Sequence, residues 1–234
     1  MKTFTWQAIC FAGALAALVS FPHVSSAAQD CSFGGVISPP LPADGDACIA
    51  TGAIKAKGTL DVTEDATGGE FDVEDGMTLR IYRSGSSPGD LLIELGAAFD
   101  AGVFGEETLV SEPIVIEAAG EIHNGGVLSL VAPSDSIRLR AGNDITLHGD
   151  ADILNAAQVK LVSGGDITLV NANITSRTNT VDIVASGDIL VSESTLSAKD
   201  GKGKCRFTVG GDFMDGGDNT YHCIVVVNGV VVNP

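Results

Sequence analysis

The segment GGDITLV at residues 164–170 returns as SGDILVS at residues 186–192, and this recurrence decides the fold. Each copy closes a longer pattern: an apolar-x-apolar run, then Gly or Asn, an acid and a final apolar residue. The final apolar residues of the five copies are Ile122, Ile145, Ile167, Ile189 and Phe213. Their spacings are 23, 22, 22 and 24 residues, and each lies 8 residues after the start of its run. A constant period of this length indicates stacked structural repeats.

Apolar and polar residues alternate inside each repeat, as they do over residues 137–140, and this alternation is typical of half-buried β-strands. Gly or Asn supplies the backbone angles of a corner. Another short strand follows, and then a further apolar position such as Ile153, Ile174 or Leu196. One coil of about 22 residues cannot bury its apolar face alone. We therefore predict an all-β solenoid whose neighbouring coils pair in parallel.

Two repeats carry a resemblance to known exported proteins. They are Gly165-Asp166-Ile167-Thr168-Leu169 with residues 171–174, and Gly187-Asp188-Ile189-Leu190-Val191 with residues 194–196. The chain resembles the right-handed parallel β-helix and haemagglutinin-type, adhesin-like solenoids of bacterial exported proteins over about residues 111–223. The resemblance implies a right-handed coil and an architecture that serves many functions.

The first 28 residues are predicted to be a signal peptide. Lys2 is followed by an apolar run over residues 9–19, and residues 25–28 supply the small side chains of a cleavage site. The apolar run is short for a membrane span, and no later stretch approaches the required length of about 20 residues. We therefore expect an exported protein, secreted, at the cell surface or in the periplasm, with no membrane span in the mature chain.

The flanks of the repeats are less regular. Residues 29–110 are predicted to be a β region that forms either a cap or degenerate coils, with residues 84–90 as an exposed loop. In residues 224–234, two valine runs flank Asn228-Gly229, which favours a β-hairpin with a two-residue turn. Such a hairpin either caps the last coil or pairs with another molecule.

The net charge of the chain limits the classes of molecule that it can bind. The formal net charge is −17, and loss of Lys2 with residues 1–28 leaves 30 acidic against 12 basic residues. This balance argues against nucleic acid and anionic membranes, because both bind through Lys and Arg. It fits a soluble exported protein or one that collects divalent cations.

Four cysteines remain after residue 28, and an even number in an exported chain suggests disulfides. Three connectivities are possible. We favour Cys31 with Cys48 and Cys205 with Cys223, because each pair lies within its own segment.

An acid precedes the final apolar residue of every repeat, and these acids are the candidate metal ligands. They are Glu121, Asp144, Asp166, Asp188 and Asp212. Stacked strands lie about 4.8 Å apart. Two unit charges at that distance repel by roughly 0.9 kcal/mol even in water. Calcium would offset this repulsion. Alternatively, each carboxylate bonds to the backbone of its own corner as an Asx-turn, and we prefer this second interpretation.

Catalytic patterns do not stand out in the sequence. The histidines His123, His148 and His222 do not align between repeats, and we expect them on the surface. Arg138 and Arg140 are expected to point outward. The chain beyond the signal segment has no Trp and only two Tyr, whereas sugar-binding platforms usually use aromatic rings.

We therefore expect a secreted, non-enzymatic β-solenoid that acts as a structural, cell-surface or adhesion-type module without a required cofactor. Surface glycans or other copies of the chain are the expected partners. A carbohydrate-active β-helix, either lyase-like or a glycan binder, and an end-to-end assembling fibre subunit are the alternatives.

Overall fold

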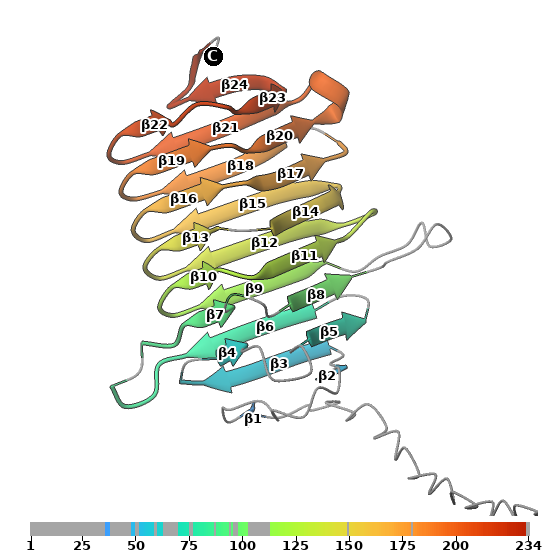
Figure 1. The fold of residues 1–234 in the computed structure, drawn as a ribbon, viewed down its shortest axis with the longest axis vertical. Helices are drawn as coiled ribbons and strands as arrows, with labels where there is room; N and C mark the ends of the chain where they lie inside the picture. Colours follow the sequence, from blue (N-terminus) through green and yellow to red (C-terminus); the bar gives the residue numbers. More distant parts are fainter. Residues whose placement is uncertain are drawn as a thin grey trace, which may run out of the picture.

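The chain winds into a column of stacked coils with three parallel sheets (Figure 1). The computed structural model describes residues 36–37, 48–49, 52–58, 60–62, 70–74, 77–86, 88–93, 95, 98–102, 113–148, 150–178 and 180–232. Within this part of the chain the only helical element is the 3-10 turn η1 (Lys199–Gly201). The all-β prediction is confirmed.

From β3 to β23, each coil contributes one strand to each sheet, in the chain order sheet 1, sheet 2, sheet 3. Sheet 1 contains, in spatial order, β1 (Val36–Ile37), β3 (Gly52–Lys57), β6 (Met77–Tyr82), β9 (Ile114–Ala118), β12 (Ser136–Ala141), β15 (Gln158–Ser163), β18 (Thr180–Ala185), β21 (Lys204–Val209), β24 (Ile224–Val227) and β25 (Val230–Val231). Sheet 2 contains β4 (Leu60–Val62), β7 (Leu91–Ile93), β10 (Ile122–Asn124), β13 (Ile145–Leu147), β16 (Ile167–Val170), β19 (Ile189–Ser192) and β22 (Phe213–Asp215). Sheet 3 contains β2 (Cys48–Ile49), β5 (Glu70–Glu74), β8 (Ala98–Gly102), β11 (Val127–Val131), β14 (Asp150–Ala156), β17 (Ala172–Ser176), β20 (Thr195–Ala198) and β23 (Thr220–His222).

The register of sheet 2 matches the sequence repeat. Ile122, Ile145, Ile167, Ile189 and Phe213 are successive partners on β10, β13, β16, β19 and β22. The starts of the apolar runs are aligned in the same way in sheet 1. Coils of 22 to 24 residues bring equivalent residues side by side, so the period read from the sequence is the coil length of the solenoid.

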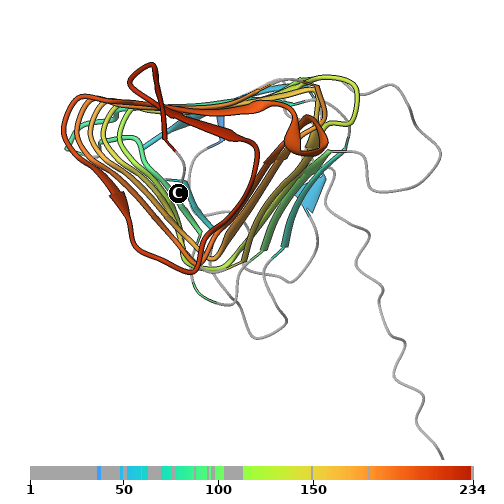
Figure 2. The same ribbon diagram turned by 90° about the horizontal axis from the view of Figure 1, so that it is seen from above.

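The coils form a three-sided column, as the view along its axis shows (Figure 2). In this view the chain passes from sheet 1 to sheet 2 to sheet 3 counterclockwise while it rises toward the reader. A path of this kind is a right-handed helix, in agreement with the expected right-handed parallel β-helix.

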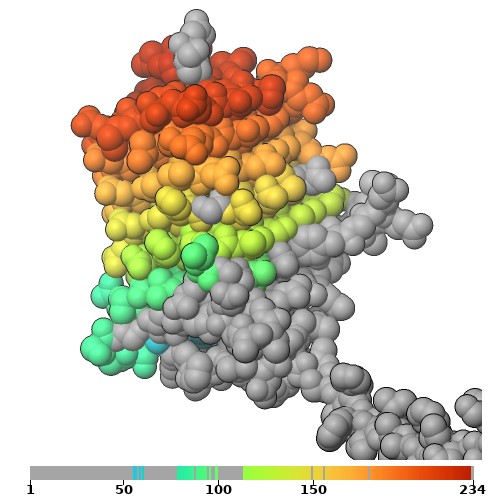
Figure 3. All heavy atoms as spheres, in the orientation of Figure 1, coloured from blue at the N-terminus to red at the C-terminus, as the bar shows by residue number. Residues whose placement is uncertain are grey.

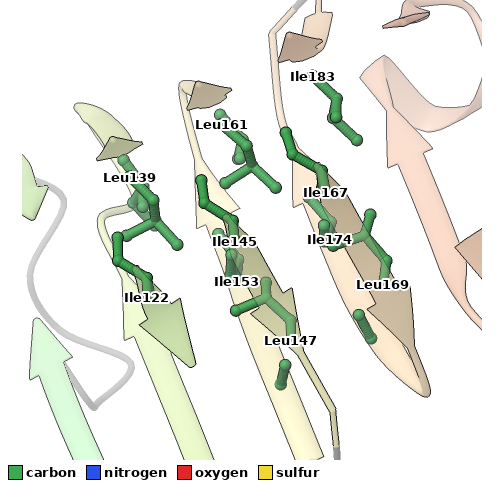
Figure 4. Packing of buried hydrophobic residues seen from close by; sticks show 14 of the residues in the cluster. Ile122, Leu139, Ile145, Leu147, Ile153, Leu161, Ile167, Leu169, Ile174 and Ile183 are labelled. Atoms are coloured by element: carbon green, nitrogen blue, oxygen red, sulfur yellow. The ribbon is translucent and has the colours of Figure 1, made fainter. Parts of the chain in front are cut away.

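Aliphatic side chains fill the interior. Leu139 and Leu161 from sheet 1, Ile145 and Ile167 from sheet 2 and Ile174 from sheet 3 point into the column in stacked rows (Figure 4). All five are 0% exposed. Complete burial of one Leu or Ile side chain stabilises a fold by about 1.5–3 kcal/mol, and each coil adds several such residues. Buried and outward residues alternate along strands such as β12, β15 and β18, as the two-residue repeat of β-structure requires.

The strands before residue 103 lie in the same three sheets as the repeats. In sheet 1, β6 pairs in parallel with β9; in sheet 2, β7 pairs with β10; and in sheet 3, β8 pairs with β11. The described part of residues 29–110 therefore continues the coils, one of the two arrangements that the sequence left open. The signal-peptide prediction for residues 1–28 lies outside the described residues.

The predicted hairpin is present at the C-terminal end. β24 pairs in parallel with β21 and antiparallel with β25. Asn228 and Gly229 form the turn with φ angles of 46° and 82°, a conformation suited to Asn-Gly. Val225 and Val226 are buried, whereas Val230 and Val231 are exposed.

Candidate functional site

The acids of the repeat occupy one corner of the column, between sheet 1 and sheet 2. Each directly precedes the first residue of a sheet 2 strand: Glu121 precedes β10, Asp144 β13, Asp166 β16, Asp188 β19 and Asp212 β22. Because those strands are in register, the five acids stack along the axis as the sequence predicts. We call them, together with Asp90, the corner acids.

Four of the corner acids, Asp90, Asp144, Asp166 and Asp188, accept a backbone N–H of the following coil. The backbone N–H of Asp166 donates to Oδ1 of Asp144 at 2.7 Å. The N–H of Asp188 donates in the same way to Asp166 at 2.8 Å, and that of Asp212 to Asp188 at 2.8 Å. An ionised acceptor makes such a bond stronger than a neutral one. The partner is the corner of the next coil, not the acid's own corner as the Asx-turn interpretation required, so that interpretation is wrong in its geometry.

Asp90 belongs to the same row and was missed by the sequence analysis. The N–H of Glu121 donates to Oδ1 of Asp90 at 2.9 Å, and Asp90 is only 8% exposed. The expectation that residues 84–90 form an exposed loop is therefore wrong at its last two residues, because Gly89 and Asp90 are both buried. The signal was present, because Gly89-Asp90-Leu91 repeats the Gly-acid-apolar pattern, but its distance from Glu121 is 31 residues in place of 22 to 24.

Each stacked aspartate requires a glycine in the following coil. A Cβ at Gly120, Gly165, Gly187 or Gly211 would lie well within 3.0 Å of Oδ1 of the aspartate stacked on it, closer than Cβ atoms are found. The exception supports the rule. Residue 143 is Asn, and the acid one coil before it is Glu121, whose longer side chain replaces the aspartate at that level.

These four aspartates therefore connect neighbouring coils by hydrogen bonds. Repulsion between stacked carboxylates is offset by backbone N–H donors, since each of these carries a partial positive charge directed at the carboxylate. Among the described residues, no group of three or more His, Cys, Asp or Glu side chains is placed to hold a metal ion. The contact that the structure does give these carboxylates is a coil-to-coil hydrogen bond.

Buried polar side chains perform a similar task at the corner between sheet 2 and sheet 3. Asn124, which is 0% exposed, accepts the N–H of Gly126 and donates to the carbonyl of His148 at 3.3 Å. Ser194, which is 1% exposed, accepts the N–H of Ala172 from the previous coil at 3.1 Å. These residues satisfy backbone groups at chain corners, where the ladder bonds of the sheets end.

The remaining predicted residues occupy separate places. His123, His148 and His222 are exposed, as expected. Arg138 and Arg140 lie on the outer face of β12, also as expected. Cys205 and Cys223 form a disulfide, which confirms that pairing. The proposed pair of Cys31 and Cys48 lies outside the residues whose side chains are described.

In the described part of the chain, no helix is long and apolar enough to cross a membrane. Comparisons with protein-family models, with curated proteins and with solved structures found no match.

Proposed function

We propose that the chain is an exported, non-enzymatic β-solenoid that serves as a structural or adhesion-type module at the cell surface or outside the cell. The corner acids carry this proposal. The repeated acids are the strongest candidates for a functional site in the sequence. In the structure, Asp90, Asp144, Asp166 and Asp188 each accept a backbone N–H from the next coil. A carboxylate held in this way supports a rigid column.

The surface of the column supports the same proposal. The coils stack as continuous layers in the space-filling view (Figure 3), so the molecule presents extended, regular faces. Side chains on such faces are fixed by the strand register at intervals of about 4.8 Å. Rigid, repetitive display of side chains suits contact with other extended molecules better than it suits the enclosure of a small substrate.

Three measurements test the proposal. Thermal unfolding with chelator and then with calcium should give the same midpoint, because the N–H groups replace the ion. A panel of neutral and acidic polysaccharides should show neither reducing-sugar release nor unsaturated product. Fractionation of cells that express the full chain should place it outside the cytoplasm. Turnover of any polysaccharide would favour the carbohydrate-active alternative, and retention in the cytoplasm would contradict the export proposal.

End-to-end assembly is a second candidate, because Val230 and Val231 on β25 are 64% and 60% exposed at the end of the column. Against it, Val227 and Val232 pack partly on the core, which fits a cap. Removal of residues 224–234 separates the two roles in light scattering. Aggregation of the shortened chain would favour the cap, whereas loss of an assembly formed by the full chain would favour the fibre contact.

A further inference from the structure

Basic residues are segregated to one side of this acidic protein. Eight of the 13 Lys and Arg residues lie on strands of sheet 1, and the described strands of sheets 2 and 3 contain none. The eight are Lys55, Lys57, Arg80, Arg138, Arg140, Lys160, Lys204 and Arg206. Only two acids, Glu117 and Asp182, lie on the strands of this sheet. Sheet 1 therefore presents a positive face on a chain of net charge −17.

Two of the eight basic residues form ion pairs with those two acids. Arg80 binds Glu117 at 2.9 Å, and the fork of Arg206 binds both oxygens of Asp182 at 2.6 and 2.9 Å. Between them, Arg138, Arg140 and Lys160 form no ion pair with any described residue. We call these three residues the basic triad.

Arg140 lies opposite Glu117 and Lys160 opposite Asp182 on the neighbouring strands, but two features of the basic triad are unfavourable for an isolated protein. Arg138 and Lys160 are direct partners on β12 and β15, and like charges in that relation destabilise a sheet. Nε of Arg138 is buried without a hydrogen-bond partner, the one such side-chain nitrogen or oxygen in the described part of the chain. A buried donor without an acceptor costs free energy. Both features are relieved by an anion bound across the triad.

A hollow adjoins the triad at the corner of sheet 1. It has a volume of about 240 Å³, and Arg80, Tyr82, Glu117 and Arg140 line it. Tyr82 is 43% exposed, although large apolar rings are usually covered. An aromatic ring beside two guanidinium groups offers a flat face for a sugar ring and planar donors for an acidic group.

We propose that sheet 1, from β6 to β15, binds an acidic polysaccharide whose sugar rings carry carboxylate or sulfate groups. The basic triad binds the acidic groups, and Tyr82 contacts a sugar face in the hollow. This proposal rests on the adhesion-type role and names its ligand class. The alternative occupant is the acidic face of a second copy, since β14 carries Asp150 and Asp152. We commit to the polysaccharide because a flat sheet face would leave the hollow unfilled, whereas a sugar ring can enter it.

Binding is measured by calorimetry on the full chain, with polygalacturonate for carboxylate, dextran sulfate for sulfate and neutral dextran as the uncharged probe. We expect binding to at least one charged polymer, weakened by salt because exposed charges are screened, and none to neutral dextran. The variant R138Q/R140Q/K160Q should lose at least about tenfold in affinity, since charge-assisted hydrogen bonds are lost. Tyr82→Ala should weaken binding while its salt dependence persists.

The matched control is R177Q/K199Q/K202Q, which removes the same charge from residues outside the sheet 1 strands. It should bind like the parent chain. Equal loss in both triple variants would overturn the proposal in favour of unspecific charge attraction. Failure of both charged polymers to bind would also overturn it. The surface role is tested separately by cell fractionation, so it would stand if the chain is found outside the cytoplasm.

Light scattering distinguishes binding of a second copy of the chain from binding of a polysaccharide. Self-association that the triad variant abolishes, without polysaccharide binding, would overturn the proposal and assign the face to a second copy. Should the triple variant unfold, Arg140→Gln alone provides the same comparison, because Arg140 is exposed. Loss of polysaccharide affinity in that single variant supports the proposal, and unchanged affinity contradicts it.

Discussion

The carboxylate of Asp166 occupies the space that any side chain at residue 187 would need. Gly187→Ala should therefore destabilise the fold by about 1–3 kcal/mol through overpacking. Asp166→Ala should cost about 1 kcal/mol for the lost hydrogen bond. In the double variant the clash is absent, so its loss should be smaller than the sum by about 1 kcal/mol.

Urea unfolding of the four proteins measures this coupling. Asn143→Ala is the matched control, because residue 143 already carries a Cβ and should stay within about 0.5 kcal/mol of the parent. Strict additivity of Gly187→Ala and Asp166→Ala would show that the carboxylate and the glycine do not share space.

The break in the row at Glu121 allows the reverse experiment. Glu121→Asp alone should destabilise the fold, because the shortened side chain meets the Cβ of Asn143. Asn143→Gly alone should cost up to about 1 kcal/mol in backbone entropy. The double variant should form one more contact between an aspartate and the glycine of the next coil. Its loss of stability should therefore be smaller than the sum of the two single losses by about 1 kcal/mol.

Hydrogen exchange of the backbone amides measures the added hydrogen bond directly. The N–H of Asp144 should gain protection in the double variant and in neither single variant. Equal protection of that amide in all four proteins would mean that the new aspartate does not bind it.

The coil length and the strand register could be predicted from the sequence because they depend on one variable, the spacing along the chain. The spacings of Ile122, Ile145, Ile167 and Ile189 are the same in the sequence and in sheet 2. The hydrogen-bond donors to these carboxylates could not be predicted, because each lies 22 to 31 residues away on the next coil, as in Asp166 with Asp188. Spacing alone does not distinguish that donor from one in the acid's own corner.

Other parts of the site depended on contacts that leave no local pattern. Asp90 could not be assigned to the row of corner acids, because an insertion lengthens its coil to 31 residues before Glu121. The hollow beside Tyr82 forms where β6, β9 and β12 end together. Periodicity showed that Arg140 faces outward, but the side chains around it come from coils that only the fold brings together.

Alkaline stability should depend on Tyr221. Burial raises the pKa of its phenol, and the charge of Asp215 and the hydrogen bond to it raise that pKa further. The native state therefore keeps this proton at a pH where an unfolded tyrosine, with a pKa near 10, loses it. The stabilisation is complete below about pH 10 and is lost as the pH rises above that value.

Tyr221→Phe removes the titrating group, so its free energy of unfolding should fall less steeply above about pH 10 than that of the parent. Denaturant unfolding between pH 8 and pH 11 measures the slopes. Asp215→Asn should give an intermediate slope, because burial of the phenol remains. Identical slopes in the parent and Tyr221→Phe would contradict a raised pKa.

The disulfide between Cys205 and Cys223 should stabilise the last coil locally. It closes a loop of 18 residues, for which the chain-entropy model gives about 3 kcal/mol. In C205A/C223A, amides of β23 and β24 should exchange faster, whereas those of β12 should be unchanged until global unfolding. Equal acceleration at β12 would show that the bridge stabilises the whole column.

Asn228 should stabilise the hairpin both by its backbone conformation and by its side chain. Its Oδ1 accepts the N–H of Val209 at 2.9 Å, and its Nδ2 donates to the carbonyl of Val209 at 3.2 Å. Asn228→Gly keeps the positive φ but loses both bonds, at a cost of about 1–2 kcal/mol. Asn228→Ala also disfavours that φ, which adds about 1 kcal/mol.

Thermal unfolding should therefore rank the parent above Asn228→Gly and Asn228→Gly above Asn228→Ala. Equal losses of thermal stability in the two variants would show that the positive φ of residue 228 does not contribute. Amide exchange at Val209 tests the other contribution, because its N–H should lose protection in both variants. Full protection at Val209 in Asn228→Gly would mean that the turn, and not the side-chain amide, holds the hairpin on β21.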